Sequence, residues 1–215
     1  MSTETQNERE LVIVSLYPRD MNIYGDRGNV LALARRAQAH GLTPRVVEVN
    51  PGDPMPETVD IVLGGGGQDS GQGRVAIDLA ERADELRGLA DDGVPMLMIC
   101  GLFQLFGHRF VTHAGDELTG IGVLDVETRG GEERMIGNIV LESSEFGEIV
   151  GYENHSGVTV LGPGSVPLGR VLQGAGNNPT DGVEGARSGN VIGSYLHGSL
   201  LPKNPAVADF LIRAA

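Results

Sequence analysis

The chain is poor in aromatic and basic residues. Phe, Trp and Tyr together make up 4% of its 215 residues, and tryptophan is absent. So few aromatic rings argue against a surface on which nucleic-acid bases stack. The 16 Lys and Arg are outnumbered by 29 Asp and Glu, which gives a net charge of −13. Because basic side chains are what neutralises phosphate groups, this balance argues against binding to nucleic acid or to an anionic membrane surface.

Cysteine and long apolar runs are also scarce. The single cysteine, Cys100, excludes an internal disulfide and favours a reducing, cytoplasmic location. The longest near-apolar run, 94–107, contains proline, glycine and glutamine and is too short to span a bilayer, so we expect no transmembrane segment. Residues 1–10 are polar and lack the order of a signal peptide, which predicts a disordered leader. Residues 11–215 are then expected to form one domain.

Glycine, in contrast, is abundant, with 33 residues and no collagen-like repeat, which indicates tight turns and close backbone approaches. The first half alternates apolar runs with segments of helical periodicity, and Gly41 is expected to end the first helix. The predicted strands are 11–16, 45–49, 59–63 and 95–99, and the predicted helices are 30–40 and 73–92, the latter as one helix or two. Strands that are apolar throughout favour a parallel sheet covered on both faces.

The second half has short strand-like segments separated by Gly and Asn, at 122–128, 135–141, 148–152, 158–161, 169–172 and 191–196. We expect these strands to be antiparallel or mixed and to extend the same sheet. Asn204 and Pro205 suit the N-cap and first position of a last helix. The expected fold class is a single α/β domain, with a mostly parallel sheet flanked by helices and added antiparallel strands.

Cys100 is placed where a nucleophile is often found. It follows a predicted buried strand and precedes a short helix-compatible segment, and ligands bind at this edge of open α/β sheets. A sharp strand–turn–helix bend would expose the sulfur, and the helix N-terminus favours the thiolate. The alternative is an inert cysteine in the core, and position alone gives the two interpretations equal weight.

Five histidines are candidates for a base: His40, His108, His113, His155 and His197. His197 follows the predicted strand 191–196, so it shares an edge with Cys100 if the two strands are parallel. Taken alone, a histidine at a strand end is more often structural.

Four glycines, 64–67, follow the predicted strand 59–63. They are not a phosphate-binding loop, because Gln68 and Asp69 stand where Lys and Ser or Thr are needed. The backbone N–H groups of these glycines can donate hydrogen bonds to an oxyanion that forms during a reaction. The alternative is a tight turn without a catalytic role.

Together these features resemble the class I, triad-type, glutamine amidotransferases, and within them the cobyric-acid-synthase-like branch. The resemblance sharpens to the GatD family, the glutaminase subunits of lipid II isoglutaminyl synthase. It rests on LYPRDMNIYGDRGNVLAL, IVLGGGGQD, ICGLFQ, RMIGNIVLES, GYENHSG, GAGNN and GSYLHGSLLPKNP. It covers about residues 11–212 and implies a flavodoxin-like domain.

The resemblance implies roles for matched positions. Cys100 would be the nucleophile and His197 the general acid/base. The oxyanion hole would combine the N–H group of Gly101 with one from the glycine run, at Gly66 or Gly67.

Four further residues would bind the substrate, L-glutamine. Arg134 would hold the α-carboxylate, for which a planar guanidinium is suited, and its plainer alternative is a solvated charge at a strand end. Gln104, Asn177 and Asn178 would line the pocket. Asp20 and Asp26 are expected to shape their loop.

The sequence shows no nucleotide or metal site, so the resemblance places ATP and Mg²⁺ on a partner. That partner would be a Mur-ligase-like (MurT-like) synthetase subunit in a heterodimer. It would use the ammonia to amidate the D-glutamate α-carboxylate of the lipid II stem peptide to D-isoglutamine, a step of peptidoglycan synthesis.

The chain departs from common amidotransferase patterns at three positions. Met98 and Leu102 stand two residues before and after Cys100, where many amidotransferases have small residues in the turn that carries the nucleophile. Either this turn is looser here, or the residues packed against it are smaller. Ser199 stands where many families have the acid that orients the histidine. Another group, such as a backbone carbonyl, must then orient His197.

Three alternatives remain open at this point. The chain could serve another ATP-dependent amidation such as corrinoid synthesis, although 215 residues leave no room for the fused synthetase domain usual there. It could be a DJ-1/PfpI-like cysteine hydrolase or redox sensor, although no Glu follows the predicted strand 11–16. It could also be a non-catalytic scaffold subunit with a degenerate elbow.

Overall fold

A six-stranded, mostly parallel sheet forms the centre of the computed structural model, which describes residues 10–67, 69–197 and 199–215. Its order is β11-β12-β4-β3-β1-β2, and all neighbours are parallel except β11 and β12. The strands are β1 (Glu10–Leu16), β2 (Thr43–Val49), β3 (Ile61–Gly64), β4 (Met96–Ile99), β11 (Ala186–Ser188) and β12 (Val191–Ser194). Without β11 the order is that of flavodoxin-like folds, which confirms the predicted fold class.

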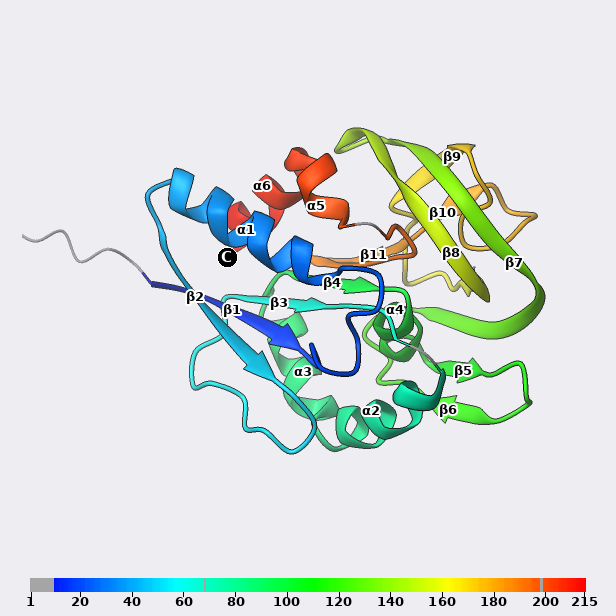
Figure 1. Ribbon diagram of the computed structural model, residues 1–215, viewed down its shortest axis with the longest axis horizontal. Helices are drawn as coiled ribbons and strands as arrows, with labels where there is room; N and C mark the ends of the chain where they lie inside the picture. Colours follow the sequence, from blue (N-terminus) through cyan, green and yellow to red (C-terminus); the bar gives the residue numbers. More distant parts are fainter. Residues whose placement is uncertain (1–9, 68, 198) are drawn as a thin grey trace, which may run out of the picture.

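The apolar composition of the central strands explains their place. β3, β4 and β12 are buried throughout, as is β1 after Glu10, because helices cover both faces. Figure 1 shows α1 (Arg27–Ala39), α5 (Leu200–Lys203) and α6 (Pro205–Ala214) on one side, and α2 (Asp69–Glu81) and α3 (Ala83–Asp91) on the other. The buried α4 (Gly101–Phe106) follows β4. Within the described residues, no helix has the length and apolarity to cross a membrane.

The strands of the second half form a second sheet, so the expectation that they extend the first sheet is wrong for all but β11 and β12. The path is β10-β9-β7-β5-β6, with β8 paired to β7. Its strands are β5 (Arg109–Val111), β6 (Glu117–Thr119), β7 (Val126–Ser143), β8 (Gly147–Leu161), β9 (Gly169–Gln173) and β10 (Val183–Glu184). The long antiparallel β7–β8 hairpin satisfies its own backbone hydrogen bonds, and Figure 1 shows it beyond the carboxyl ends of β1 and β3.

Several predicted boundaries also change. The segments 122–128 and 135–141 merge into β7, with a register irregularity between Gly130 and Met135, and 148–152 and 158–161 merge into β8. Residues 73–92 form two helices, and Gly41 has the positive φ of +80° expected of a helix-ending glycine. Glu10 already belongs to β1, and the rest of the predicted leader lies outside the described residues.

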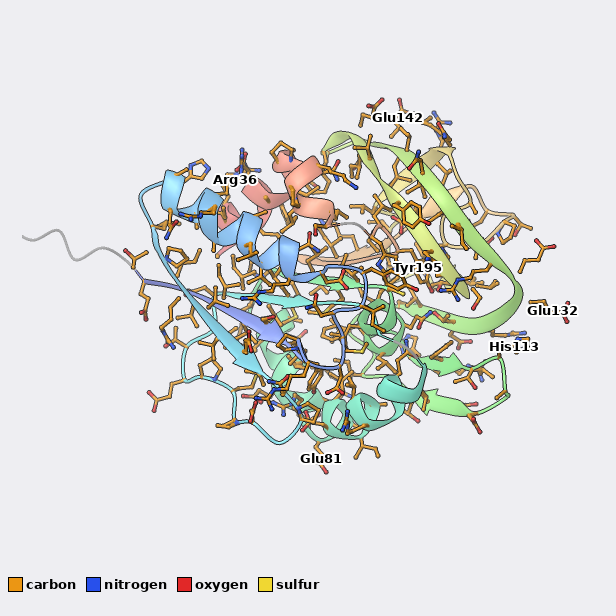
Figure 2. The ribbon with its side chains drawn as sticks, in the orientation of Figure 1. Arg36, Glu81, His113, Glu132, Glu142 and Tyr195 are labelled. Atoms are coloured by element: carbon orange, nitrogen blue, oxygen red, sulfur yellow. The ribbon has the colours of Figure 1, made fainter. Side chains whose placement is uncertain are left out.

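Buried hydrogen-bonded side chains connect the two sheets. Tyr195 lies between the sheets (Figure 2) and is fully buried, and its hydroxyl lies 2.6 Å from Thr159 Oγ1 and 3.2 Å from the Gln104 Nε2 donor. Thr128 continues the chain, 2.7 Å from Thr159. Polar groups with satisfied hydrogen bonds fix one arrangement of such an interface.

Glu184, on β10, is a fully buried acid in this region. It accepts a 2.6 Å hydrogen bond from the Tyr195 N–H and a 3.2 Å bond from the Ser194 hydroxyl. Burial raises the pKa of its carboxyl to about 8, and the charge of Glu153 adds to the increase. The folded chain therefore keeps a proton that the unfolded chain has lost, so stability falls as pH rises from about 4.5 to about 8.

We predict that Glu184→Gln removes most of this pH dependence. The amide cannot ionise, so the variant should match the wild type near pH 5 and exceed its Tm by roughly 10–20 °C near pH 9. Thermal unfolding followed by circular dichroism across pH 5–9 measures this difference. Glu142→Gln, an exposed acid that pairs with Arg170, is the matched control and should leave the pH slope unchanged. Equal wild-type and Glu184→Gln melting profiles at every pH would contradict the burial argument.

Candidate active site

Cys100 occupies a strained turn between β4 and α4. Its φ of 51° and ψ of −103° lie in a region that L-residues rarely adopt, at a cost of about 1–3 kcal/mol. Two backbone bonds hold the turn: the Cys100 N–H donates to the Ser194 carbonyl (2.8 Å), and the Cys100 carbonyl accepts from the Gln104 N–H (3.0 Å). The residue is 6% exposed and lines a pocket, so the sulfur is buried without being sealed off.

Two glycines on neighbouring strands make room for the bulky residues of this turn. A Cβ at Gly64 would overlap Leu102 and lie 2.9 Å from the Met98 sulfur, and a Cβ at Gly193 would overlap the Phe103 ring. Met98 and Leu102 are therefore accommodated by small neighbouring residues and not by a looser turn.

His197 lies at the same sheet edge because β12 is parallel to β4. It follows the end of β12, which is shorter than predicted, and its N–H donates to the Tyr152 carbonyl (2.6 Å) on β8. A Cβ built on Gly66 would lie 3.4 Å from Cys100 Sγ and 3.1 Å from His197 Cε1. The sulfur and the imidazole therefore both lie against Gly66, where a side chain would be tightly crowded.

The His197 ring is fully buried, and burial lowers its pKa to about 3, with the positive charge of Arg134 among the further causes. The imidazole is therefore neutral at pH 7 and can accept a proton. Neither ring nitrogen has a hydrogen-bond partner within the described chain.

The glycine-rich loop differs from the expectation at one position. The Gly66 N–H donates to Asp26 Oδ2 (2.9 Å) and is therefore not free to bind an oxyanion. The Gly67 nitrogen lies 3.3 Å from a Cβ built on Gly101, so the backbone N–H groups of Gly67 and Gly101 are close neighbours beside Cys100. These two groups remain as candidate oxyanion donors.

A pocket between the two sheets contains Cys100, Gln104 and Arg134, as well as Tyr24, Asn154 and His155. Arg134 Nε donates to Asn154 Oδ1 (2.7 Å), and a terminal nitrogen donates to the Tyr24 hydroxyl (2.9 Å). The structure therefore brings Arg134 and Gln104 together with Cys100, as expected from the sequence.

Asn177 and Asn178 do not line this pocket. Asn177 exchanges two hydrogen bonds with the Gly185 backbone, and Asn178 donates to the Thr159 carbonyl and Asp181. Their buried amides hold the loop between β9 and β10 in place, which replaces the substrate-binding role expected for them.

His155, which the sequence reasoning passed over, lies in the pocket wall. Its ring stacks on Tyr195 at 3.6 Å, and its Nδ1 lies 2.9 Å from the Gly157 carbonyl. Burial lowers its pKa to about 4, so it too is neutral. The GYENHSG motif indicated that this segment belongs to the site, but the direction of the His155 side chain is known only once the segment is placed in β8.

The loop acids Asp20 and Asp26 shape their loop, as expected: Asp20 pairs with Arg74, and Asp26 binds Gly66. No group of His, Cys, Asp and Glu suited to a metal ion occurs among the described residues. A cysteine, a neutral imidazole and paired N–H groups form a set suited to acyl transfer through a covalent intermediate.

Comparison with known proteins agrees with this geometry. Residues 12–205 match the CobB/CobQ-like glutamine amidotransferase domain. The chain is 40% identical over 207 residues to the lipid II isoglutaminyl synthase (glutamine-hydrolyzing) subunit GatD of Staphylococcus aureus, covering 96% of this chain and 84% of that protein. The Streptococcus pneumoniae GatD subunit is 39% identical, covering 96% and 80%.

A solved structure supports the fold. PurLQS from Thermotoga maritima superposes with a TM-score of 0.67 at 17% identity, covering 96% of this chain and 98% of that one. The family and the fold expected from the motifs are thus confirmed: the chain belongs to the CobB/CobQ-like glutamine amidotransferases, in the branch that contains the GatD subunits.

Proposed function

We propose that the chain is the glutaminase subunit of a lipid II isoglutaminyl synthase. It hydrolyses L-glutamine to glutamate and ammonia, and a Mur-ligase-like (MurT-like) synthetase subunit uses the ammonia to amidate D-glutamate in the lipid II stem peptide. The observation that carries this proposal is that Cys100 and His197 both lie against Gly66, and that Cys100 shares a pocket with Arg134. The family relationship supports the choice of glutamine as the substrate.

The reaction has two stages. His197 takes the thiol proton of Cys100 while the sulfur attacks the carboxamide carbon of glutamine. The N–H groups of Gly67 and Gly101 hold the negative oxygen of the tetrahedral intermediate. The C–N bond then breaks, His197 returns the proton to the leaving nitrogen as ammonia departs, and a thioester remains. His197 next takes a proton from water as the water oxygen attacks the thioester. The C–S bond then breaks, His197 returns the proton to the sulfur, and glutamate leaves.

Arg134 is suited to hold the α-carboxylate of glutamine. Its bonds to Asn154 and Tyr24 use two of the five guanidinium donors and fix the plane of the group at the pocket. The remaining donors can bind a carboxylate in a bidentate manner. Gln104, whose side chain is tied to Gln72 and Tyr195, forms part of the pocket wall.

The acceptor chemistry is assigned to the partner. Amidation of a carboxylate requires its activation, and we assign ATP and Mg²⁺ to the synthetase subunit of a heterodimer. The nucleophile is a cysteine thiol that is in no disulfide and must stay reduced, which favours action in the cytoplasm. Ammonia must reach the acceptor unprotonated, so the two sites are expected to communicate through the interface.

We predict that Cys100→Ala abolishes glutamate release because no other group can form the thioester. The test uses the complex with the synthetase subunit, ATP and lipid II, with either glutamine or ammonium chloride as the nitrogen source. The variant complex should fail with glutamine and keep amidating lipid II with ammonium chloride, which shows that its fold and partner contacts are intact. Retained glutaminase activity in Cys100→Ala would refute the assignment.

We predict that Arg134→Ala raises the KM for glutamine about 10–100-fold, since a charge-assisted hydrogen bond contributes roughly 1.5–3 kcal/mol. The variant should also lose the preference for glutamine over an analogue that lacks the α-carboxylate. Steady-state glutamate release with both compounds measures this effect. Arg170→Ala, which removes an exposed arginine paired with Glu142, should change neither value. Unchanged glutamine affinity in Arg134→Ala would remove this residue from the binding site.

We predict that Asp26→Ala lowers kcat at least tenfold while Asp26→Asn stays close to the wild type. The alanine variant leaves the buried Gly66 N–H without its acceptor and frees the loop that presents the Gly67 N–H. The asparagine oxygen can still accept that hydrogen bond. Glutaminase kinetics and urea unfolding of both variants separate a loss of loop geometry from a general loss of stability. Equal kcat values in Asp26→Ala and the wild type would show that the loop keeps its shape without the Asp26 carboxylate.

A further inference from the structure

We propose that Tyr24 is a positioning residue with two separable functions: its ring holds the imidazole of His197, and its hydroxyl holds the guanidinium of Arg134. This inference rests on the proposed function and extends it by naming the group that orients the base. Tyr24 lies in the loop between β1 and α1, on the other side of the pocket from the second sheet.

His197 lacks the contacts that usually orient a catalytic imidazole. Its backbone is fixed by the bond from its N–H to the Tyr152 carbonyl, but neither ring nitrogen has a partner within the described residues. The Tyr24 ring contacts it directly, with ring centroids 4.3 Å apart and planes at 44°. Since the imidazole is fully buried, rotation of its ring would require Tyr24 to move.

Ser199 stands where related families have an acid, and it supports the Tyr24 loop instead of the imidazole. Its hydroxyl donates to the carbonyl of Gly25 (2.7 Å), the residue next to Tyr24. Gly28 makes room for this hydroxyl, because a Cβ there would overlap it. The residue at the place of the acid therefore acts on His197 through the Tyr24 loop.

The same loop is fixed to the glycine run on either side of Tyr24. The Ile23 N–H donates to the Gly66 carbonyl (3.2 Å), and the Asp26 carboxylate accepts from the Gly66 N–H (2.9 Å). Tyr24 is thus held relative to Gly66, against which both Cys100 and His197 lie. A side chain presented by such a fixed loop can set the geometry of its neighbour to within fractions of an ångström.

The hydroxyl of Tyr24 reaches the substrate side of the pocket. It accepts the 2.9 Å hydrogen bond from Arg134, which Asn154 holds from the other direction. Loss of the hydroxyl should therefore weaken glutamine binding, whereas loss of the ring should also disturb proton transfer. The two functions predict different kinetic effects for two substitutions.

The kinetic test compares Tyr24→Phe with Tyr24→Leu in glutamine hydrolysis by the complex with the synthetase subunit. Tyr24→Phe keeps the ring, and should raise KM about tenfold while kcat stays within about twofold of the wild type. Tyr24→Leu should raise KM similarly and lower kcat at least tenfold. Leu31→Ala, which trims an exposed side chain on α1, is the control and should match the wild type. If Tyr24→Leu keeps the wild-type kcat, the positioning of His197 by the ring is refuted.

A second measurement does not depend on glutamine hydrolysis. The ring current of Tyr24 should displace the His197 Cε1–H resonance in the NMR spectrum, which is assigned by its absence in His197→Asn. The displacement should persist in Tyr24→Phe and disappear in Tyr24→Leu. The same resonance in all three proteins overturns the proposal even if the chain proves to have no glutaminase activity. Conversely, the expected NMR shifts without any glutamine hydrolysis would count against the proposed function and leave the contact established.

Discussion

The active site depends on one close approach: the sulfur of Cys100 and the ring of His197 both lie against Gly66, within 3.4 Å of the position that a Cβ would take there. This approach requires that β3, β4 and β12 be parallel neighbours, because only then do the three following loops leave the sheet at one edge. It also favours glycine at 66, since a Cβ there would lie only 3.0 Å from Cys100 Cβ and 3.1 Å from His197 Cε1. The apolar strands and the glycine run therefore both serve to bring Cys100 and His197 together.

The wall of the site opposite these loops comes from the second sheet. A chain of buried hydrogen bonds runs from Gln72 through Gln104 and Tyr195 to Thr159 and Thr128, and so connects the floor of the pocket to β7 and β8. His155 stacks on the Tyr195 ring within this wall. Such a network leaves few alternative arrangements, so the pocket is pre-formed before substrate arrives.

Much of the first sheet was predictable because its four central strands, β1, β3, β4 and β12, are mostly apolar and are bounded by glycine, proline and helical segments. The shared edge of Cys100 and His197 followed from the same pattern. The second sheet was not predictable. The alternation of buried and exposed residues along β7 and β8 shows that one face of each strand is covered, but it does not show which strand is the neighbour of which.

The errors at single residues have the same origin. The bonds from Asn177 and Asn178 to backbone groups, and from Asp26 to Gly66, join segments whose contact is decided by the fold. A sequence motif can indicate that a residue lies near a site, but it does not specify the atom with which that residue forms a hydrogen bond. His155 was only one of five candidate bases in the sequence, because its orientation depends on the register of β8 within the hairpin.

The surroundings of His197 explain how a base can work here without an adjacent acid in the described part of the chain. Burial keeps the imidazole neutral, which is the form that accepts the thiol proton, and the nearby charge of Arg134 acts in the same direction. A carboxylate beside the ring would raise its pKa, whereas the Tyr24 ring fixes its position without adding charge. If Arg134 binds the α-carboxylate of glutamine as proposed, that carboxylate offsets the positive charge and raises the pKa of His197. The imidazolium that forms during attack is then less costly when glutamine is bound, so the proposed substrate-binding residue would also make the base stronger.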